Sequence, residues 1–136
     1  MAELTRLVRD DDYEEMGAAY QCVHVEVLDE ALRVHGVADA ATREEICQAF
    51  LFNMGSFHDQ GWLKATPDGP RVCPLLGFST GLLNTDTPVE EIGAVYVPSE
   101  SFSFHEYASG SVAAFFEGDP AARIETGNFV MEDEDD

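Results

Sequence analysis

The amino-acid sequence predicts a single α+β domain in which two N-terminal helices pack on a mainly antiparallel sheet of four or five strands, with one or two short extra helices. Two observations lead to this prediction. Apolar residues recur at steps of three and four in the first part of the chain, which is typical of amphipathic helices. From Trp62 onward, turn signals separate short apolar segments, which is typical of strands. We expect residues 1–131 to form this domain, because a chain of 136 residues can bury one hydrophobic core.

The first expected element is a long amphipathic helix from about Asp12 to His35. One of the aspartates at positions 10–12 can cap its N-terminus, and Gly36 is suited to follow its C-terminus. The apolar side chains are expected to form one stripe that packs on the core of the domain. The members of this stripe are Tyr13, Met16, Tyr20, Val23, Val27, Ala31 and Val34.

A second helix is expected to start at Thr42. Thr42 and Glu45 have the spacing of a capping box, in which each side chain accepts from the other residue's free backbone amide. The last turns, up to Met54, are apolar on nearly every side, which predicts that this end of the helix is buried. We expect the helix to end at Gly55 or Ser56.

A β-hairpin is expected next. Residues 66–69 read Thr-Pro-Asp-Gly, which favours a type I turn, and the strands should lie at residues 62–65 and 71–76. Residues 77–86 are expected to form a loop.

The last third of the chain mixes short elements. Thr87 and Glu90 form a second capping box, which predicts a helix of one to two turns. The further expected elements are a buried strand at 92–97, an alternating strand at 101–105, a short helix at 110–117, a last strand at 123–131 and a disordered acidic tail at 132–136.

Net charge restricts the classes of partner. The chain has 27 acidic residues against 7 basic ones, a net charge of −20, and only five of the acids lie in the tail at 132–136. A surface of this sign repels phosphate backbones and anionic lipids. We therefore expect a basic protein partner, and neither direct nucleic-acid binding nor membrane binding.

Apolar segments and cysteines indicate the cellular compartment. The chain has no run of about 18 apolar residues, and its N-terminus is charged, which predicts a cytoplasmic location. The three cysteines, Cys22, Cys47 and Cys73, are odd in number and far apart, which favours reduced thiols over a disulfide framework.

Four residues are candidates for catalysis. His58 and Asp59 are adjacent beside Trp62, where a histidine next to a carboxylate could act as a general base or as half of a metal site. His105 and Cys73 could complete such a site if the fold brings them close. The sequence contains no Cys-x-x-Cys, His-Glu-x-x-His, Gly-x-Gly-x-x-Gly or Gly-x-Ser-x-Gly motif. It therefore favours a non-enzymatic protein without a metal or cofactor.

The acidic residues are candidates for partner binding. Some follow the first helix, and others surround the aromatic residues near position 100, which would form either interface anchors or part of the core. The candidates are Asp11, Asp12, Glu15, Glu26, Asp29, Glu30, Glu90, Glu91, Glu100 and Glu106.

Three functions are compatible with these features. The first is an acidic, non-enzymatic protein that inhibits or neutralises a basic macromolecule, as a toxin immunity protein or as a nucleic-acid mimic acting on a nuclease or defence complex. The alternative is a small metal- or cysteine-dependent enzyme that uses His58, Asp59, His105 and Cys73. A second alternative is an accessory protein whose acidity reflects a salty cytoplasm.

Overall fold

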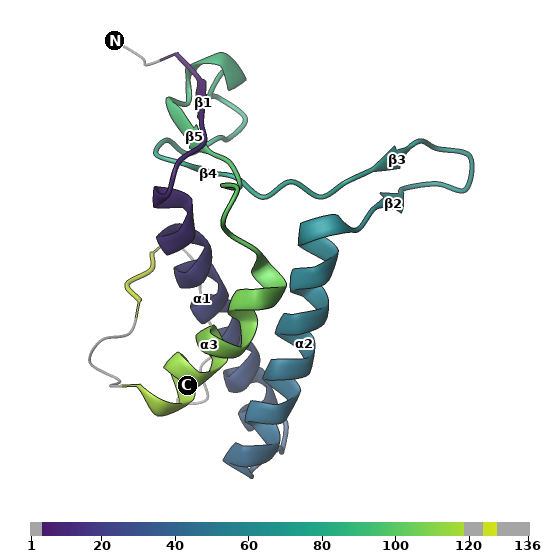
Figure 1. Ribbon diagram of the computed structural model, residues 1–136, viewed down its shortest axis with the longest axis vertical. Coiled ribbons are helices and arrows are strands. Elements are labelled where there is room, and N and C mark those ends of the chain that lie inside the picture. Colours follow the sequence, from purple (N-terminus) through teal and green to yellow (C-terminus); the bar gives the residue numbers. More distant parts are fainter. Residues whose placement is uncertain (1–3, 119–123, 128–136) are drawn as a thin grey trace.

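The computed structural model describes residues 4–118 and 124–127, and it confirms a mixed α+β class. In this part of the chain, three helices lie side by side and the short strands gather beyond one end of them (Figure 1). The helices are α1 (Asp12–Val34), α2 (Ala40–Gln60) and α3 (Phe104–Glu117). None of them combines the length and apolar character that a membrane span requires. The predicted tail at 132–136 lies outside the described residues.

The strands form a mixed sheet and a separate hairpin. Strand β1 (Arg6–Val8) pairs in parallel with β5 (Ala94–Tyr96), and β4 (Phe78–Ser79) pairs antiparallel with the other side of β5. The predicted sheet of four or five mainly antiparallel strands is therefore wrong. Strands β1 and β4 are too short to give a periodic signal, and β4 lies where we expected a loop.

Helix α1 is confirmed, but the apolar residues in the second half of its predicted stripe are exposed and not buried. The buried residues are Tyr13, Gly17, Gln21 and Val25, whereas Val27 is 38% exposed. The buried face can hold a polar residue because Gln21 is fully bonded: its amide donates to the Phe104 carbonyl at 2.8 Å and accepts from the Ser111 hydroxyl at 2.8 Å. Asp10 accepts from the amide of Asp12 at 3.0 Å at the start of the helix.

Helix α2 begins and ends outside its predicted bounds. Asp39 caps it by accepting from the amide of Thr42 at 3.2 Å and from its hydroxyl at 2.7 Å, so the predicted capping box is wrong. The helix also runs through Gly55. A Cβ at Gly55 would lie 2.7 Å from the backbone nitrogen of His105, so this glycine permits close contact with α3 and does not end the helix.

The expected burial at the C-terminal end of α2 is also wrong. Phe50 is 45% exposed, Phe52 is 50% exposed and Met54 is 36% exposed. Only the side that carries Cys47, Leu51 and Gly55 is buried.

The hairpin is confirmed. Strand β2 (Leu63–Lys64) pairs antiparallel with β3 (Arg71–Val72), so both strands are shorter than the predicted 62–65 and 71–76. The amide of Gly69 donates to the carbonyl of Thr66 at 3.0 Å, which closes the predicted turn. Figure 1 shows that the hairpin extends away from the helices and from the three-stranded sheet.

The two elements expected around residue 90 are confirmed. The short helix is a single 3₁₀ turn, η1 (Val89–Glu91), and the strand is β5, which is shorter than predicted and in which only Ala94 is buried. The second capping box does not form, because the Thr87 hydroxyl donates to Asn84 Oδ1 at 2.9 Å.

The strand expected at 101–105 is wrong, because α3 already begins at Phe104. Ser103 caps α3 by accepting from the amide of Glu106 at 3.4 Å. The short helix expected at 110–117 is the C-terminal part of α3. Of the strand expected at 123–131, only residues 124–127 are described, and they lie in neither a helix nor a strand.

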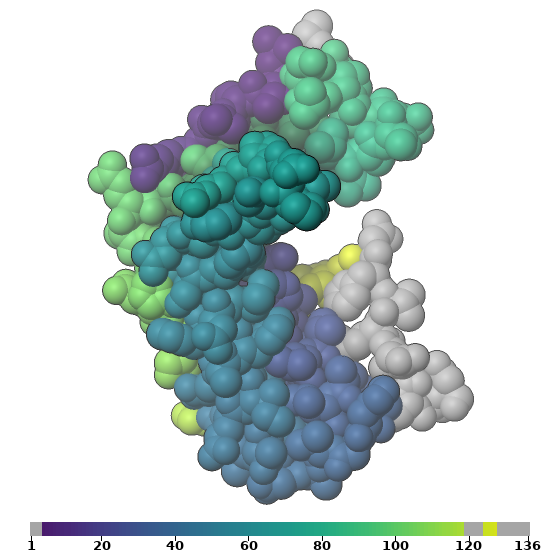
Figure 2. Space-filling view, turned by 90° about the vertical axis from the view of Figure 1, so that its right-hand side faces the viewer, coloured from purple at the N-terminus to yellow at the C-terminus, as the bar shows by residue number. Residues whose placement is uncertain are grey.

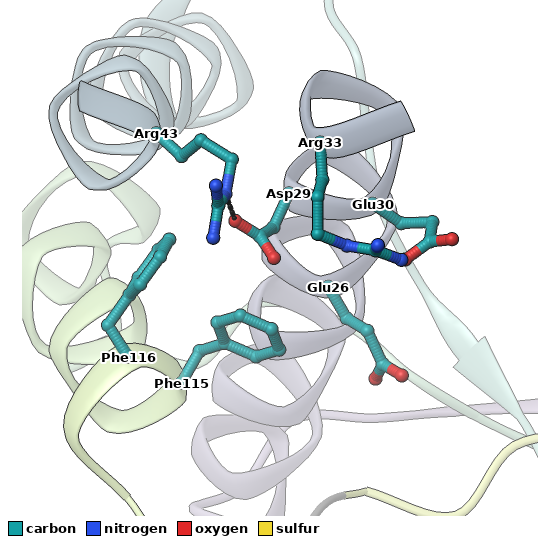
Figure 3. Close-up of a pocket in the computed structure, with 7 residues that line it drawn as sticks. All are labelled: Glu26, Asp29, Glu30, Arg33, Arg43, Phe115 and Phe116. Atoms are coloured by element: carbon teal, nitrogen blue, oxygen red, sulfur yellow. Dashed lines mark hydrogen bonds and ion pairs between the residues drawn. The ribbon is translucent and has the colours of Figure 1, made fainter. Parts of the chain in front are cut away.

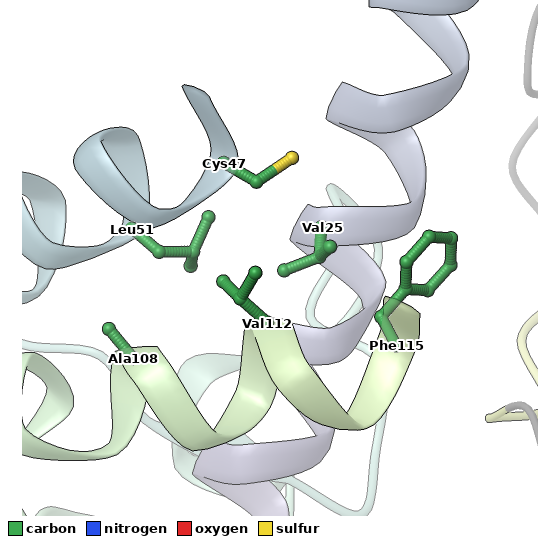
Figure 4. Close-up of a cluster of buried hydrophobic side chains, with 6 residues drawn as sticks. All are labelled: Val25, Cys47, Leu51, Ala108, Val112 and Phe115. Carbon is green, nitrogen blue, oxygen red and sulfur yellow. The ribbon is translucent and has the colours of Figure 1, made fainter. Parts of the chain in front are cut away.

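The core has two parts. Val25, Cys47, Leu51, Ala108, Val112 and Phe115 fill the space between the three helices (Figure 4). The second part joins the helices to the sheet: Tyr13, Phe102 and Phe104 are buried together, with Phe78 of β4 packed against them. The Tyr13 hydroxyl donates to the Leu76 carbonyl at 2.7 Å, so its polar end is bonded.

Candidate functional site

Two of the four catalytic candidates, Asp59 and His105, are in direct contact. Asp59 lies on the last turn of α2 and not in the expected loop, and its side chain is 17% exposed. One carboxylate oxygen accepts from the amide of Phe104 at 2.8 Å. The other oxygen accepts from the amide of His105 at 2.9 Å, from His105 Nδ1 at 2.6 Å and from the Ser103 hydroxyl at 2.9 Å.

These bonds make Asp59 a cap of a neighbouring helix. The first amides of α3 have no partner inside their own helix, and the carboxylate of α2 satisfies two of them. Burial alone would raise the pKa of the Asp59 carboxyl, but the hydrogen bonds from His105, Phe104 and Ser103 together lower it below its ordinary value. The charge of Asp59 is therefore stabilised by the fold.

The group of Ser103, His105 and Asp59 does not have the geometry of a catalytic triad. In a triad, the serine and the aspartate contact opposite ring nitrogens of the histidine. Here both contact Nδ1, Ser103 at 2.9 Å and Asp59 at 2.6 Å. Because the carboxylate only accepts, Nδ1 carries a proton, and this nitrogen cannot take one from the serine. The arrangement joins α2 to α3.

The other two catalytic candidates lie apart from this contact. The ring of His58 packs on Phe104 with centroids 5.3 Å apart, and the ring of His24 packs on Tyr20 at 4.2 Å. Burial, and then the neighbouring His58, lower the pKa of His24. Cys73 is exposed on the segment that follows β3. Within residues 4–118 and 124–127, no group of three or more His, Cys, Asp or Glu residues could hold a metal ion.

Five of the ten acidic candidates gather where α1 and α3 begin. The Glu14 carboxylate accepts from the Ser101 hydroxyl and, at 3.3 Å, from the Tyr107 hydroxyl, so the first turn of α1 is bonded to both sides of the α3 N-terminus. We call the exposed acids next to these contacts the acidic cluster. Its members are Asp11, Asp12, Glu15, Glu100 and Glu106.

Three further acidic candidates line a recess of about 340 Å³ between α1, α2 and α3 (Figure 3). Two of them already pair with arginines of the same chain: Asp29 with Arg43 at 2.6 Å and Glu30 with Arg33 at 2.5 Å. Arg43 also donates to the carbonyl of Val37 at 2.9 Å. The Asp29–Arg43 pair connects the end of α1 with the start of α2, whereas Glu30 and Arg33 pair within α1. The recess is lined by Glu26, Asp29, Glu30, Arg33, Arg43, Phe115 and Phe116.

Of the two possibilities for the aromatic residues near position 100, the structure has the core and not the interface anchors. Phe102 is 8% exposed and Phe104 is 4% exposed, so both belong to the core. The last two acidic candidates, Glu90 and Glu91, are exposed on η1 beside the sheet, where the Glu90 carbonyl accepts from the amide of Thr5 at 2.8 Å.

The exposure of apolar side chains on α2 and the hairpin was not predicted from the sequence. The signal was present in the sequence. Residues 46–57 contain no charged residue, although a quarter of the chain is charged, and we interpreted this run as a buried helix end.

Comparison with known proteins gave no match: no family model, no curated protein and no solved structure resembles this chain significantly.

Proposed function

We propose that this protein is an acidic, non-enzymatic binding protein that inhibits or neutralises a basic macromolecular partner. The observation that carries the proposal is the acidic cluster, whose exposed acids are the sequence neighbours of Glu14 in α1 and of its partners Ser101 and Tyr107 at the start of α3. Like charges repel when they are held close together, and a cationic surface relieves that repulsion on binding.

The remaining charges support the same proposal. No Asp or Glu in the described ranges is buried, so these carboxylates contribute to the field outside the protein. Such a field steers a basic protein toward the surface and raises its association rate. A basic toxin and a nucleic-acid-binding enzyme both have the required cationic face, so an immunity protein and a nucleic-acid mimic are the two forms of this function.

Part of the acidic cluster also stabilises the fold. Asp12 and Glu15 lie in the first turn of α1, and Glu106 lies in the first turn of α3. A carboxylate there stabilises a helix by about 0.3–1 kcal/mol. For this reason the test uses neutral isosteres instead of charge reversals, and it needs a matched control.

The test begins with capture of partners from a lysate of the source at low salt, followed by elution at high salt and mass spectrometry. The affinity of the retained basic protein is then measured for two triple variants. The cluster variant is Asp11→Asn, Glu15→Gln and Glu106→Gln. The control variant, which changes exposed acids elsewhere by the same chemistry, is Asp86→Asn, Glu117→Gln and Glu125→Gln.

We expect the cluster variant to raise Kd at least about tenfold, equivalent to ~1.4 kcal/mol, while the control changes it far less. An equal effect of both triples would contradict a localised interface. Retention of no basic protein would contradict the proposed function as a whole. If the captured partner is a toxin, the wild-type chain should inhibit its toxic activity. If the partner is a nuclease, the wild-type chain should inhibit its cleavage of DNA or RNA.

A further inference from the structure

Helices α1 and α3, which lie side by side in Figure 1, leave a groove of about 350 Å³ between them. Ala18 and Cys22 of α1 form one wall, and Glu106, Tyr107, Gly110 and Ala114 of α3 form the other. From Glu106 to Ala114 the groove follows α3 for about 12 Å, since a helix rises about 1.5 Å per residue. A groove of this length has room for large side chains of another protein.

The groove is open because its walls carry small side chains. Ala18 and Ala114 contribute one methyl group each, and Gly110 contributes no side chain. A Cβ at Gly110 would have no neighbour within 4 Å, so the space over this residue is open. An incoming side chain can therefore enter the groove without moving either helix.

The groove is apolar because the polar atoms of its walls are bonded within the chain. The Cys22 thiol donates to the Ser111 carbonyl at 3.7 Å, and the Ser111 hydroxyl donates to Gln21 at 2.8 Å. The Tyr107 hydroxyl donates to Glu14 at 3.3 Å. Burial raises the pKa of the Cys22 thiol, so this side chain is uncharged at neutral pH. An apolar group is therefore the occupant that the walls favour.

One end of the groove is acidic. Glu106 both lines the groove and belongs to the acidic cluster. Glu15, another member of the cluster, lies one turn before Ala18 and therefore on the same side of α1. Burial, and then the charges of Glu14 and Glu106, raise the pKa of the Tyr107 hydroxyl, because both carboxylates lie close to this wall of the groove. The acidic cluster and the groove thus form one continuous surface.

Charge complementarity indicates the chemistry of the occupant. Carboxylates at the end of an apolar groove favour a protein segment in which large apolar side chains lie next to lysine or arginine. The same carboxylates repel nucleic acids and anionic lipids. Protein interfaces have this arrangement, with apolar anchors in pockets at the centre and charged residues at the rim. The occupant that fits both features is a segment of a basic protein.

We propose that the groove between α1 and α3 anchors the basic partner. Large apolar side chains of the partner enter the groove, and adjacent lysine or arginine side chains pair with Glu15 and Glu106. The inference rests on the proposed function, and it adds an apolar contact to the electrostatic one. Salt screens the charge pairs but not the apolar contact, so the two contributions can be measured separately.

The probe is a helical peptide of lysine and leucine of about four turns, with the leucines on one side. The control peptide has alanine in place of each leucine, so it has the same charge without the large apolar side chains. Binding of both to the full chain is measured by NMR titration of the backbone amides. We expect the leucine peptide to bind at least about tenfold more tightly. The signals of Ala18, Cys22, Gly110 and Ala114 should shift most, because these residues line the groove.

Two single substitutions fill the groove. Ala114→Leu and Gly110→Leu each add a large side chain at an exposed position of α3, and leucine is a good helix former, so both variants should stay folded. Each should bring the affinities of the two peptides to within about twofold of each other. The matched control is Ala49→Leu, which should leave the preference for leucine unchanged. Ala49 is exposed on α2, which faces the viewer together with the hairpin in Figure 2. Denaturant unfolding checks that all three variants are folded.

The cluster variant described above separates this inference from the proposed function. It should weaken both peptides and lower the salt dependence of their binding, whereas the filled groove should weaken only the leucine peptide. Equal binding of the two peptides to wild type, with both weakened by the cluster variant, would overturn the groove and leave the acidic interface in place. Shifts centred on α2 or the hairpin, or a leucine preference that survives both fillings, would also overturn the groove. A cluster variant that binds both peptides as tightly as wild type would contradict the charge pairing and, with it, the proposed function.

Discussion

At the scale of single residues, Asp59 is the most heavily bonded acid of the described structure, and its replacement has a clear expected effect. In Asp59→Asn, one carboxylate oxygen becomes an amide donor, which faces either the N–H of Phe104 or the donors of His105 and Ser103, so at least one donor loses its acceptor. We expect a loss of about 2 kcal/mol or more in the free energy of unfolding, since hydrogen bonds to charged groups contribute about 1.5–3 kcal/mol each. Denaturant unfolding measures it, with the exposed Asp86→Asn as control, which should lie within about 0.5 kcal/mol of wild type.

The difference in stability between wild type and Asp59→Asn should also depend on pH. The pKa of Asp59 is lower in the folded chain than its ordinary value of 3.8, so the unfolded chain takes up the proton first as the pH falls. The contribution of Asp59 is complete above about pH 3.8 and is lost as the pH falls through the lower folded pKa. The stability gap between wild type and Asp59→Asn should therefore be constant near neutral pH and narrow below pH 4. A gap that widened in acid would contradict the assigned role.

At the scale of elements, the contact between α2 and α3 depends on Gly55. In an isolated helix, alanine is more stable than glycine by about 1 kcal/mol. At position 55, however, the added Cβ would lie 2.7 Å from the backbone of Phe104 and His105, which cannot move aside as a side chain could. We expect Gly55→Ala to destabilise the protein by about 1–3 kcal/mol.

Gly110 of α3 is the matched control, because a Cβ there would have no neighbour within 4 Å. Gly110→Ala should stabilise the protein by about 0.5–1 kcal/mol. Denaturant unfolding of the two variants should thus give changes of opposite sign. If Gly55→Ala were as stable as Gly110→Ala, the helices would not pack as closely as described.

The elements that the sequence predicted correctly are those with local causes. Helix α1 follows from its apolar spacing, and the hairpin follows from the turn at residues 66–69. The errors came from contacts distant in sequence. Gly55 looked like a helix end, and its real role is contact with α3, about fifty residues later in the chain. Residues 102–105 alternate as a strand would, but Ser103 and Asp59 together start a helix there.

In the candidate sites, too, the features with local causes were predictable and those that depend on contacts distant in sequence were not. Asp59 was singled out because it follows His58, whereas its partner is His105, to which no sequence spacing connects it. Exposure of the acids was predictable from hydration of charge. The grouping of Asp11, Asp12, Glu15, Glu100 and Glu106 was not, because it depends on how Glu14 bonds to Ser101 and Tyr107.

At the scale of the whole molecule, the net charge of −20 on 136 residues predicts a stability that depends on salt. Repulsion between carboxylates favours the expanded unfolded chain, and dissolved ions screen it. We expect the midpoint of thermal unfolding, Tm, to rise by about 5 °C or more between 10 mM and 0.3 M NaCl, equivalent to ~1–2 kcal/mol for a chain of this size. Most of that rise should be complete by 0.3 M, where the Debye length is already shorter than about 8 Å.

The shape of this salt curve separates a binding protein from an accessory protein adapted to a salty cytoplasm. A chain that is folded at 0.15 M salt and reaches its plateau early does not need its acids for folding in molar salt, as the proposed binding protein requires. A chain that folds only near molar salt needs those ions for stability, and its acidity would then no longer support the proposed inhibitor. NaCl and KCl should act alike if screening is the cause, whereas a strong preference for one of them would indicate specific ion binding and contradict the screening account.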